Sequence, residues 1–345
     1  MNQIYKGFLF AMAVTFMGAC SDNQLEEETL KSGDISLTAD ARATGEERCA
    51  SMKVLADKLR ENPGLAKRME AIEAHTQRFI QNQKAATGKG KPGTGDGGGT
   101  TTTGETTITI PVYVNVLYNT SEQNISDAQI KSQIDVLNAD FTAANKDLSL
   151  TPDLFKSTTS NLNIKFTLVN VIRKYSTKPR WGTTDAMKSS QKGGIDPTNP
   201  ETSLNIWVCN IGGGILGYAQ FPGGSLSTDG IVVGPQYFGN TGYVAAPFDK
   251  GRTATHEIGH WLNLRHIWGD GGCGVDDFVA DTPGSDSPNY GCPTFPTVKC
   301  NNTNMTMNYM DYTDDACMYM FTQGQKDRSR AIFAEGGPRS SFVVQ

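Results

Sequence analysis

The chain has 345 residues, of which 31 are Lys or Arg and 36 are Asp or Glu, so its formal net charge is -5. This mild acidity offers no basic surface for nucleic acid, and no apolar run reaches the roughly 18 residues that a membrane-spanning helix needs. The length accommodates two or three domains, including a catalytic domain of about 200 to 250 residues with a sizeable core.

Residues 1–20 have the pattern of an export signal. A basic residue precedes a short apolar stretch over residues 8–16, and two small residues stand directly before Cys20. The stretch is too short to span a membrane. The segment resembles a bacterial lipoprotein signal, in which Cys20 becomes the lipidated first residue; the alternative is a plain secretory signal. We expect an exported lipoprotein of the outer membrane or cell surface, with residues 21–45 as an acidic tether.

Residues 46–87 are predicted to form a small helical prodomain. Apolar residues recur at helical spacing over 52–59, an Asn-Pro-Gly sequence at 62–64 interrupts the pattern, and Leu65 resumes it. A helical pair of this size is too small to be stable alone. Residues 88–104 are mostly Gly and Thr, which bury little apolar area and hold no helix, so we expect a flexible, easily cut linker.

From residue 105 to residue 345 the pattern is that of one α/β domain. Apolar residues alternate along a predicted strand at 108–116, and a helix follows with Ser126 as its N-cap and Gln129 completing a capping box. Further strands are predicted at residues 162–172, 204–208, 218–221 and 231–233. A closing helix is predicted from Thr322, with Gln325 at the capping-box position.

Three of the four histidines lie within eleven residues. On a helix, residues four apart share a face, so His256 and His260 can offer two imidazoles to one Zn²⁺, and Glu257 can reach the metal-bound water. His266 supplies a third ligand if the helix ends near Asn263 and the chain turns back.

The third histidine makes this pattern specific. With four His in 345 residues, chance places one at a given position roughly once in 90, and the spacing is similar to the extended metzincin motif. The alternative is three unrelated histidines on a helix and its loop. Metzincins usually carry Gly where this chain has Asn263; Asn also visits the left-handed region, at a cost of about 1 kcal/mol.

The segment Asn308-Tyr309-Met310-Asp311-Tyr312 resembles the Met-turn beneath a metzincin zinc site. Met310 would pack under the imidazoles without being a ligand. Tyr312 matches the position from which some metzincins bring a phenol toward the metal or the oxyanion. Core packing is the alternative for both residues, but their place 44 residues after His266 favours a functional role.

Three segments together resemble the pappalysin family, in particular its bacterial, cytophagalysin-like members. They are HEIGHWLNLRHIWGD, GCGVDDFVADTP, and NYMDYTDDACM followed by FTQGQ, and the resemblance covers about residues 106–335. It implies a two-lobed, metzincin-type α/β catalytic domain with a twisted mixed sheet and an active-site helix. It also implies a metalloendopeptidase with one catalytic zinc, two disulfides and bound structural calcium.

The remaining family features fall on cysteines and aspartates of the last quarter of the chain. Four cysteines allow three pairings, and the resemblance favours Cys273 with Cys300 and Cys292 with Cys317. Oxygen donors of the right hardness for Ca²⁺ are Asp270, Asp276, Asp277 and Asp281. A solvated acidic loop is the alternative interpretation of these four aspartates.

The pair Arg48-Cys49, which we place on the first predicted helix, resembles the cysteine switch of latent metzincins. Zinc deprotonates a coordinating thiol, so the Cys49 thiolate would occupy the open metal position and exclude the catalytic water. The alternatives are a free thiol and a disulfide with Cys209, which lies in an apolar strand and is expected to be a buried small residue. Cleavage in the linker would release the protease and leave the lipid on the prodomain.

The sequence therefore predicts a latent zinc endopeptidase whose partner is a protein or peptide substrate. Glu257 would take a proton from zinc-bound water, and the zinc with Tyr312 would hold the oxyanion. An edge strand at 217–221 would pair with an extended peptide, and Asp314 or Asp315 would favour a basic side chain.

Two other classes fit the same motifs: a noncatalytic, zinc-stabilised surface adhesin and a zinc hydrolase of a non-peptide substrate. Nucleic acid is not an expected partner, membrane contact is expected only through a lipid on Cys20, and nothing in the sequence indicates an oligomeric state.

Overall fold

The computed structural model describes residues 48–87 and 106–343. These residues belong to one compact unit of the chain. The predicted signal peptide with Cys20, the acidic tether and the Gly/Thr linker lie outside the described residues. None of the described helices is long and apolar enough to cross a membrane.

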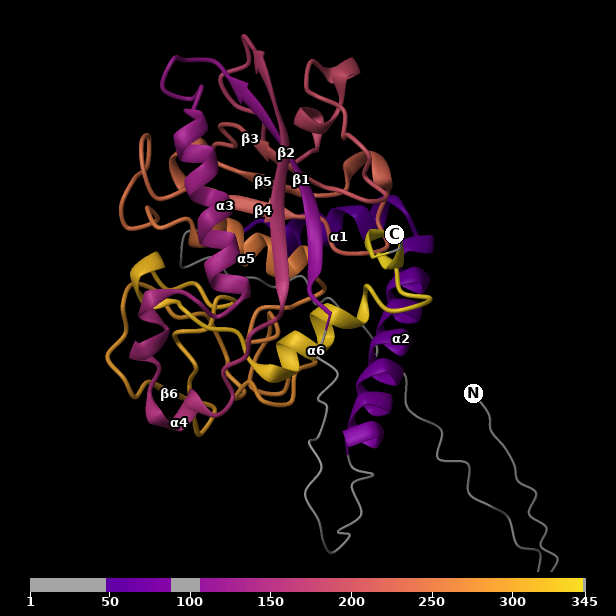
Figure 1. Cartoon of the computed structure of the whole chain (residues 1–345), viewed down its shortest axis with the longest axis vertical. Coiled ribbons are helices and arrows are strands. Elements are labelled where there is room, and N and C mark those ends of the chain that lie inside the picture. Colours follow the sequence, from indigo (N-terminus) through magenta and orange to yellow (C-terminus); the bar gives the residue numbers. More distant parts are fainter. Residues whose placement is uncertain (1–47, 88–105, 344–345) are drawn as a thin grey trace, which may run out of the picture. The chain divides into compact units, whose positions relative to one another are not determined.

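A five-stranded mixed sheet forms one layer of the domain (Figure 1), and it confirms the predicted α/β fold. Its order is β2-β1-β3-β5-β4, and β4 is the only antiparallel member of this sheet. The bounds are β1 Ile108–Tyr118, β2 Ile164–Tyr175, β3 Leu204–Val208, β4 Gly217–Ala219 and β5 Ile231–Val233. All five predicted strands are confirmed, with small shifts in their ends.

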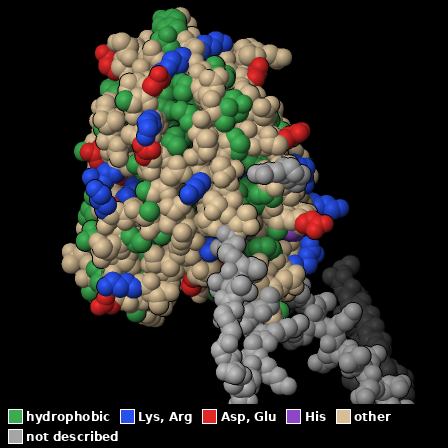
Figure 2. Space-filling view, viewed as in Figure 1, with side chains coloured by type: hydrophobic (Ala, Val, Ile, Leu, Met, Phe, Trp, Pro, Cys, Tyr) green, Lys and Arg blue, Asp and Glu red, His purple; other side chains and the backbone are tan. Residues whose placement is uncertain are grey.

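The two edges of the sheet have different surroundings. Every side chain of the inner strand β3 is buried, as expected for a strand covered on both faces. On the face shown in Figure 2, apolar side chains gather over β2 and α3, where a groove is lined by Leu168, Val169 and Val171. Val169 is half-exposed there. The opposite edge, β4, is fully buried and borders the functional site.

Helix α3 (Asp127–Phe141) packs against β2 and α5. Its N-cap Ser126 accepts a hydrogen bond from the Gln129 backbone N–H, as predicted, but the reciprocal half of the capping box is absent from the hydrogen bonds of α3. The Gln129 side-chain oxygen accepts instead from the Tyr243 N–H at 2.9 Å, and its NH2 group donates to the Pro235 and Phe238 carbonyls. A buried amide that left these partners would stay unsatisfied, and that cost exceeds the gain from an exposed cap.

The active-site helix α5 (Arg252–Trp261) lies between the sheet and a lower region that contains α4 (Asp153–Lys156), α6 (Gln323–Ala331) and β6 (Val298–Lys299). All ten residues of α5 are buried. This arrangement confirms the expected two-lobed domain, with the helix at the boundary between the lobes. The predicted capping box of the closing helix is complete in α6, between Thr322 and Gln325.

Disulfides hold the lower region where regular structure is sparse. Both expected pairs are present, Cys273–Cys300 and Cys292–Cys317. The first pair joins Cys273 to the turn between β6 and β7 (Asn302–Thr303), which form a two-stranded hairpin. Cross-links of this kind stabilise a domain mainly by restricting its unfolded chain.

The prodomain is a pair of helices, α1 (Ser51–Glu61) and α2 (Gly64–Thr87), broken at Asn62 and Pro63 as predicted. Its apolar residues do not pack into a core of their own. Leu55, Leu65 and Met69 form a cluster with Phe221 of the catalytic domain, and α2 lies along α6. The pair therefore depends on the catalytic domain for its burial.

Candidate metal centre and catalytic site

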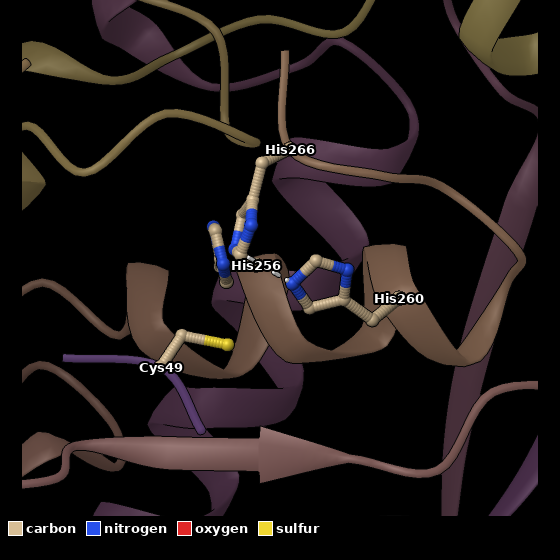
Figure 3. A group of neighbouring side chains, drawn as sticks. All are labelled: Cys49, His256, His260 and His266. Atoms are coloured by element: carbon tan, nitrogen blue, oxygen red, sulfur yellow. Dashed lines mark hydrogen bonds between the residues drawn. The ribbon is translucent and has the colours of Figure 1, made fainter. Parts of the chain in front are cut away.

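Three imidazoles converge at the C-terminal end of α5. His256 and His260 project from the helix, and His266 reaches them from the chain that follows (Figure 3). The ring centroids are 4.8 Å apart for His256 and His260, 4.5 Å for His260 and His266, and 5.2 Å for His256 and His266. One ligand atom from each histidine and the Cys49 sulfur all lie within 4.8 Å of one another.

The turn that brings His266 back is made by Asn263. Helix α5 ends at Trp261, and Asn263 has a φ of 75°. The Leu264 backbone N–H then bonds back to the Gly259 carbonyl at 2.9 Å. Asn tolerates the left-handed conformation better than other residues with a side chain, so it performs the task expected of Gly at this position.

Each imidazole uses Nδ1 to donate to an oxygen acceptor. The acceptors are the Tyr309 carbonyl for His256 (2.7 Å), the Leu264 carbonyl for His260 (2.9 Å) and the Asp270 carboxylate for His266. A proton fixed on Nδ1 leaves the Nε2 lone pair free, and such outer hydrogen bonds are what orient the histidine ligands of metal ions.

The three Nε2 atoms have no protein donor to satisfy them. Nε2 of His256 is buried without a partner among the described residues, and Nε2 of His260 lies only 3.1 Å from Nε2 of His266. Burial lowers the pKa of His256 to about 3, with the neighbouring His266 contributing, and lowers the pKa of His260 in the same way. Neutral imidazoles with converging lone pairs fit a cation such as Zn²⁺.

Glu257 is buried beside this centre. Its Oε2 accepts a hydrogen bond from the Ser51 hydroxyl at 2.8 Å and lies 3.4 Å from the Cys49 sulfur. Burial raises its pKa to about 8. A side chain at Gly217 would place Cβ only 2.9 Å from Glu257 Cγ, so the edge strand can approach the carboxylate only because this residue is Gly.

The Met-turn lies under α5. Met310 is fully buried, and a Cβ at Gly259 would collide with its sulfur. The Tyr312 ring packs 4.8 Å from the His266 ring, and its hydroxyl donates to the Cys49 carbonyl at 3.3 Å. The structure thus brings both predicted residues to the metal centre.

The segment around Cys49 is extended, so its predicted place on a helix is wrong. The Leu216 N–H donates to the Arg48 carbonyl at 2.8 Å, and the Ala50 N–H donates to the Gly217 carbonyl at 3.0 Å. This makes a parallel bridge between Cys49 and Gly217 at β4. Only an extended backbone can add to a sheet edge in this way, and α1 begins directly after it.

The bridge points the Cys49 sulfur at the imidazoles (Figure 3). Cys49 and Cys209 are both free and buried, so the alternative disulfide between them is wrong. Burial and the neighbouring Glu257 carboxylate raise the pKa of the Cys49 thiol well above its usual range. A metal ion would reverse that direction, because it deprotonates a coordinating thiol.

Arg48 fills a pocket next to the metal centre. Its Nη1 donates to the Tyr312 carbonyl at 3.0 Å and to Asp314 at 3.3 Å, and its guanidinium lies over Phe248 and Tyr290. Asp315 differs from Asp314: it is buried and accepts from two backbone N–H groups, those of Lys250 and Arg252. Asp315 lines the pocket, but the carboxylate that contacts the Arg48 side chain is that of Asp314.

The four aspartates predicted to bind calcium serve different neighbours. Asp270 bonds to His266, Asp276 to the Phe278 N–H, Asp277 to Thr282 and the Val279 N–H, and Asp281 to Thr322 and the Gly324 N–H. None of them belongs to a group of three or more close ligand atoms within residues 48–87 and 106–343. Calcium binding here stays a prediction, and Asp270 gains a role in orienting a histidine.

Sequence reasoning missed Ser51 and Gly259, and it missed what Gly217 and Asp270 do here, although it had placed Gly217 in the edge strand and Asp270 among the calcium ligands. A signal existed for Gly259, because Gly inside a helix is unfavourable and marks a close approach. A signal also existed for Asp270, which lies four residues after His266. Ser51 and Gly217 gave none, since their role depends on the pairing of two segments far apart in the chain.

Known proteins with similar sequences are extracellular metalloproteases. The family model described as pregnancy-associated plasma protein-A matches residues 196–334. Extracellular metalloprotease 1 of Coccidioides posadasii is 32% identical over 243 residues, which are 67% of this chain and 79% of that protein. An extracellular metalloprotease of Pyricularia oryzae is also 32% identical, over 67% of this chain and 77% of its own length.

Solved structures of mirolysin from Tannerella forsythia are similar in fold and sequence. Mature mirolysin in complex with a cleaved peptide is 47% identical and has a TM-score of 0.68, and the match covers 70% of this chain and 97% of that one. A mutant of promirolysin is 41% identical with a TM-score of 0.74, over 86% of this chain and 96% of that one. The larger coverage by the proenzyme indicates that this chain also carries a prosegment.

Proposed function

This chain belongs to the pappalysin family of zinc metalloendopeptidases, and on that premise we propose that His256, His260 and His266 hold its catalytic metal and that Glu257 is its general base. The protein is a zinc-dependent endopeptidase made as a zymogen. The observation that carries the residue assignment is the convergence of three Nε2 atoms beside a buried carboxylate: that of His256 has no partner among the described residues, and those of His260 and His266 lie 3.1 Å apart. The relatives give no support to an adhesin or to a hydrolase of non-peptide substrates.

The chemistry follows from what each side chain can do. Zinc held by three neutral imidazoles would supply a water molecule with a pKa lowered toward about 7. Glu257 takes the proton of the attacking water on Oε2 and passes it to the leaving amine. The Tyr312 hydroxyl already donates to a peptide carbonyl, that of Cys49, and would donate in the same way to the oxyanion of a substrate.

Substrate binding would use the groups that the prosegment now occupies. The Leu216 N–H and the Gly217 carbonyl would bond to an extended peptide backbone. Asp314 would accept a basic side chain, as it now accepts that of Arg48. Replacing Asp314 with Ala and profiling the cleaved peptides tests this preference, and an unchanged profile would rule it out.

Latency would rest on residues 46–87. The Cys49 thiolate would complete the metal coordination, while Ser51 holds the Glu257 carboxylate. Cleavage within residues 88–104 would release a mature domain from about residue 105, and a lipid on Cys20 would stay with the prosegment. Export is supported by the extracellular relatives. Structural calcium bound by Asp276, Asp277 or Asp281 is a further part of this proposal.

The deciding experiment compares two proteins that span residues 21–345, one with the native sequence and one with Glu257→Ala. Both are incubated with zinc and calcium, and their intact mass is measured over time. Self-maturation predicts that only the Glu257 form shortens, with new N-termini in residues 88–106. Equal zinc content in both proteins, measured by elemental analysis, shows that the variant keeps its metal site. If the two proteins shorten at the same rate, Glu257 is not the general base. If neither shortens on its own, and neither cleaves casein after trypsin has removed the prosegment, the assignment fails.

A further inference from the structure

Two arginines, Arg265 and Arg328, lie near the carboxylate of Glu73, which belongs to the prosegment: Arg328 binds it, and Arg265 is close enough for the two charges to interact. Arg265 stands directly before His266, and Arg328 lies on α6. Glu73 of α2 accepts from Arg328 Nη1 at 2.9 Å and from Nη2 at 2.5 Å. This two-point contact is the geometry that arginine uses to recognise a carboxylate.

Arg328 is held by the catalytic domain independently of Glu73. Its Nε donates to the Asn263 carbonyl at 2.8 Å, and its guanidinium lies 5.2 Å from the centre of the Phe278 ring. The side chain is 2% exposed. The guanidinium therefore keeps its place when the prosegment leaves, with the edge that contacts Glu73 uncovered.

Arg265 lies on the same side of the metal centre. Its guanidinium is 4.9 Å from the centre of the Phe221 ring, which in turn packs 5.2 Å from the His260 ring. Nη1 contacts only the weak acceptor Met52 Sδ, at 3.7 Å, and the buried Nε has no hydrogen-bond partner in the part of the chain that the structure describes.

Loss of the prosegment leaves this pair without its acceptor. Asp270 and Asp277 are the other carboxylates whose charges reach the pair, but Asp270 bonds to His266 and Asp277 to Thr282. Within residues 48–87 and 106–343, neither forms an ion pair with Arg265 or Arg328. Unpaired, largely buried cations are unfavourable, so the uncovered pair favours an anion.

We propose that Arg265 and Arg328 form a subsite of the mature protease that binds a Glu or Asp side chain of the peptide substrate. This rests on the proposed protease function. Glu73 occupies the subsite in the zymogen, just as Arg48 occupies the pocket of Asp314. The two sites adjoin different histidines: Arg48 contacts Tyr312, which packs on His256, and Arg265 packs on Phe221, which contacts His260. We place the acidic residue on the other side of the scissile bond from the basic one.

The test measures kcat/KM of the activated enzyme on matched peptides. Each peptide carries Arg at the preferred cleavage position and Glu, Gln or Lys at one of four positions on either side. We expect one position, across the scissile bond from Arg, where Glu is preferred over Gln by about tenfold and Lys is cut more slowly than Gln. In Arg265→Gln that Glu/Gln ratio falls toward one, and Arg265→Lys restores part of it.

The matched control is Lys131→Gln, which removes one positive charge from the exposed side of α3 and should leave the ratio unchanged. A ratio near one at every position, with peptides still cleaved, overturns the subsite and leaves the protease assignment intact. If added acetate slows the cleavage of Glu and Gln peptides equally and Glu is not preferred at any position, the arginine pair binds free anions and the substrate subsite is ruled out. If the wild-type enzyme cleaves none of the peptides, the proposed function fails instead.

Discussion

The two halves of the metal centre are held in different ways. The catalytic half consists of α5, where every residue is buried, and of the chain after it that carries His266; each of the three histidines has an oxygen partner within the catalytic domain. The prosegment half reaches the same centre through an extended segment with two backbone hydrogen bonds to Leu216 and Gly217, plus a few polar side-chain contacts. The first half is built into the core of the catalytic domain. The second adds Ala50 and Val54 to an apolar cluster that contains Trp207 and Tyr218, but it supplies none of the five strands.

Because of this difference, the residues expected to determine catalysis and those expected to determine latency lie in different parts of the molecule. Changes on α5 should damage catalysis or folding, whereas changes in residues 48–87 should leave the mature enzyme intact and alter only how fast it appears. Five substitutions test that separation, beginning with the largest expected effect.

Glu257→Gln should lower kcat/KM of the activated enzyme by about 10²- to 10⁴-fold, because the amide cannot take a proton from water. Peptide hydrolysis by enzyme activated with trypsin measures the loss, and zinc content measured in parallel should stay at that of the wild type. A loss below tenfold would mean that another group is the base.

Cys49→Ser should shorten the latent phase by at least about tenfold, because a hydroxyl is a much weaker zinc ligand than a thiolate. The time course of self-cleavage measures it, and the specific activity of the matured enzyme should not change. Cys209→Ser, at the other free and buried cysteine, is the matched control. Equal latency in the wild type and Cys49→Ser would remove the thiol from the inhibitory mechanism.

Gly259→Ala should lower the free energy of unfolding by about 1 to 3 kcal/mol, because the new Cβ would collide with Met310 Sδ. Chemical denaturation of the zymogen measures the change. Gly272→Ala is the control, since nothing lies within 4 Å of its added Cβ. If the two variants are equally stable, Met310 does not pack tightly against α5.

Ser51→Ala should speed activation by roughly fivefold, because it removes the hydrogen bonds to the Glu257 carboxylate and from the Ala219 N–H, worth about 1 kcal/mol net. Lys53→Ala, at an exposed residue of the same helix, controls for a general weakening of α1. Activation at the same rate in both variants would contradict a specific lock on the base.

Glu73→Gln should have the smallest effect, a modest loss of thermal stability of the zymogen that depends on pH. Hydrogen bonds from Arg328 and its charge lower the pKa of Glu73 despite partial burial. A depressed pKa gives stability that is present above the unfolded value of about 4.3 and is lost as the pH falls through the lower, folded value. The difference in Tm between wild type and variant should therefore be full at pH 7 and shrink below about pH 4. A constant difference would place the effect elsewhere.

The parts of the site that lie close together in the chain could be predicted from the sequence. The spacing of His256, His260 and His266 implied both the helix and the turn after it. Asn263 makes this turn with a φ of 75°. The fold followed from strand and helix periodicity, and the disulfides from family resemblance. The order of strands and helices along the chain could be predicted from these local patterns alone.

The features that failed depend on contacts between distant segments. Helical periodicity after residue 50 extended the predicted helix over Cys49, because nothing local showed that β4 offers an open edge. Gln129 had the right local chemistry for a capping box, but its side-chain oxygen accepts from the distant Tyr243 N–H, and its NH2 group donates to the carbonyls of residues 235 and 238. The role of Ser51 likewise appears only when α1 is docked beside Glu257.

The position of Arg48 in the pocket of Asp314 has a consequence for anyone who wishes to redesign the enzyme. Asp314, which we propose selects basic substrate side chains, also binds Arg48 of the prosegment. Cleavage preference and latency would therefore both depend on this carboxylate. A variant in which Asp314 is replaced would lose the ion pair with Arg48 and would be less latent during production, unless residue 48 is changed at the same time. Libraries that vary both positions together should therefore yield more intact zymogen than libraries that vary the pocket alone.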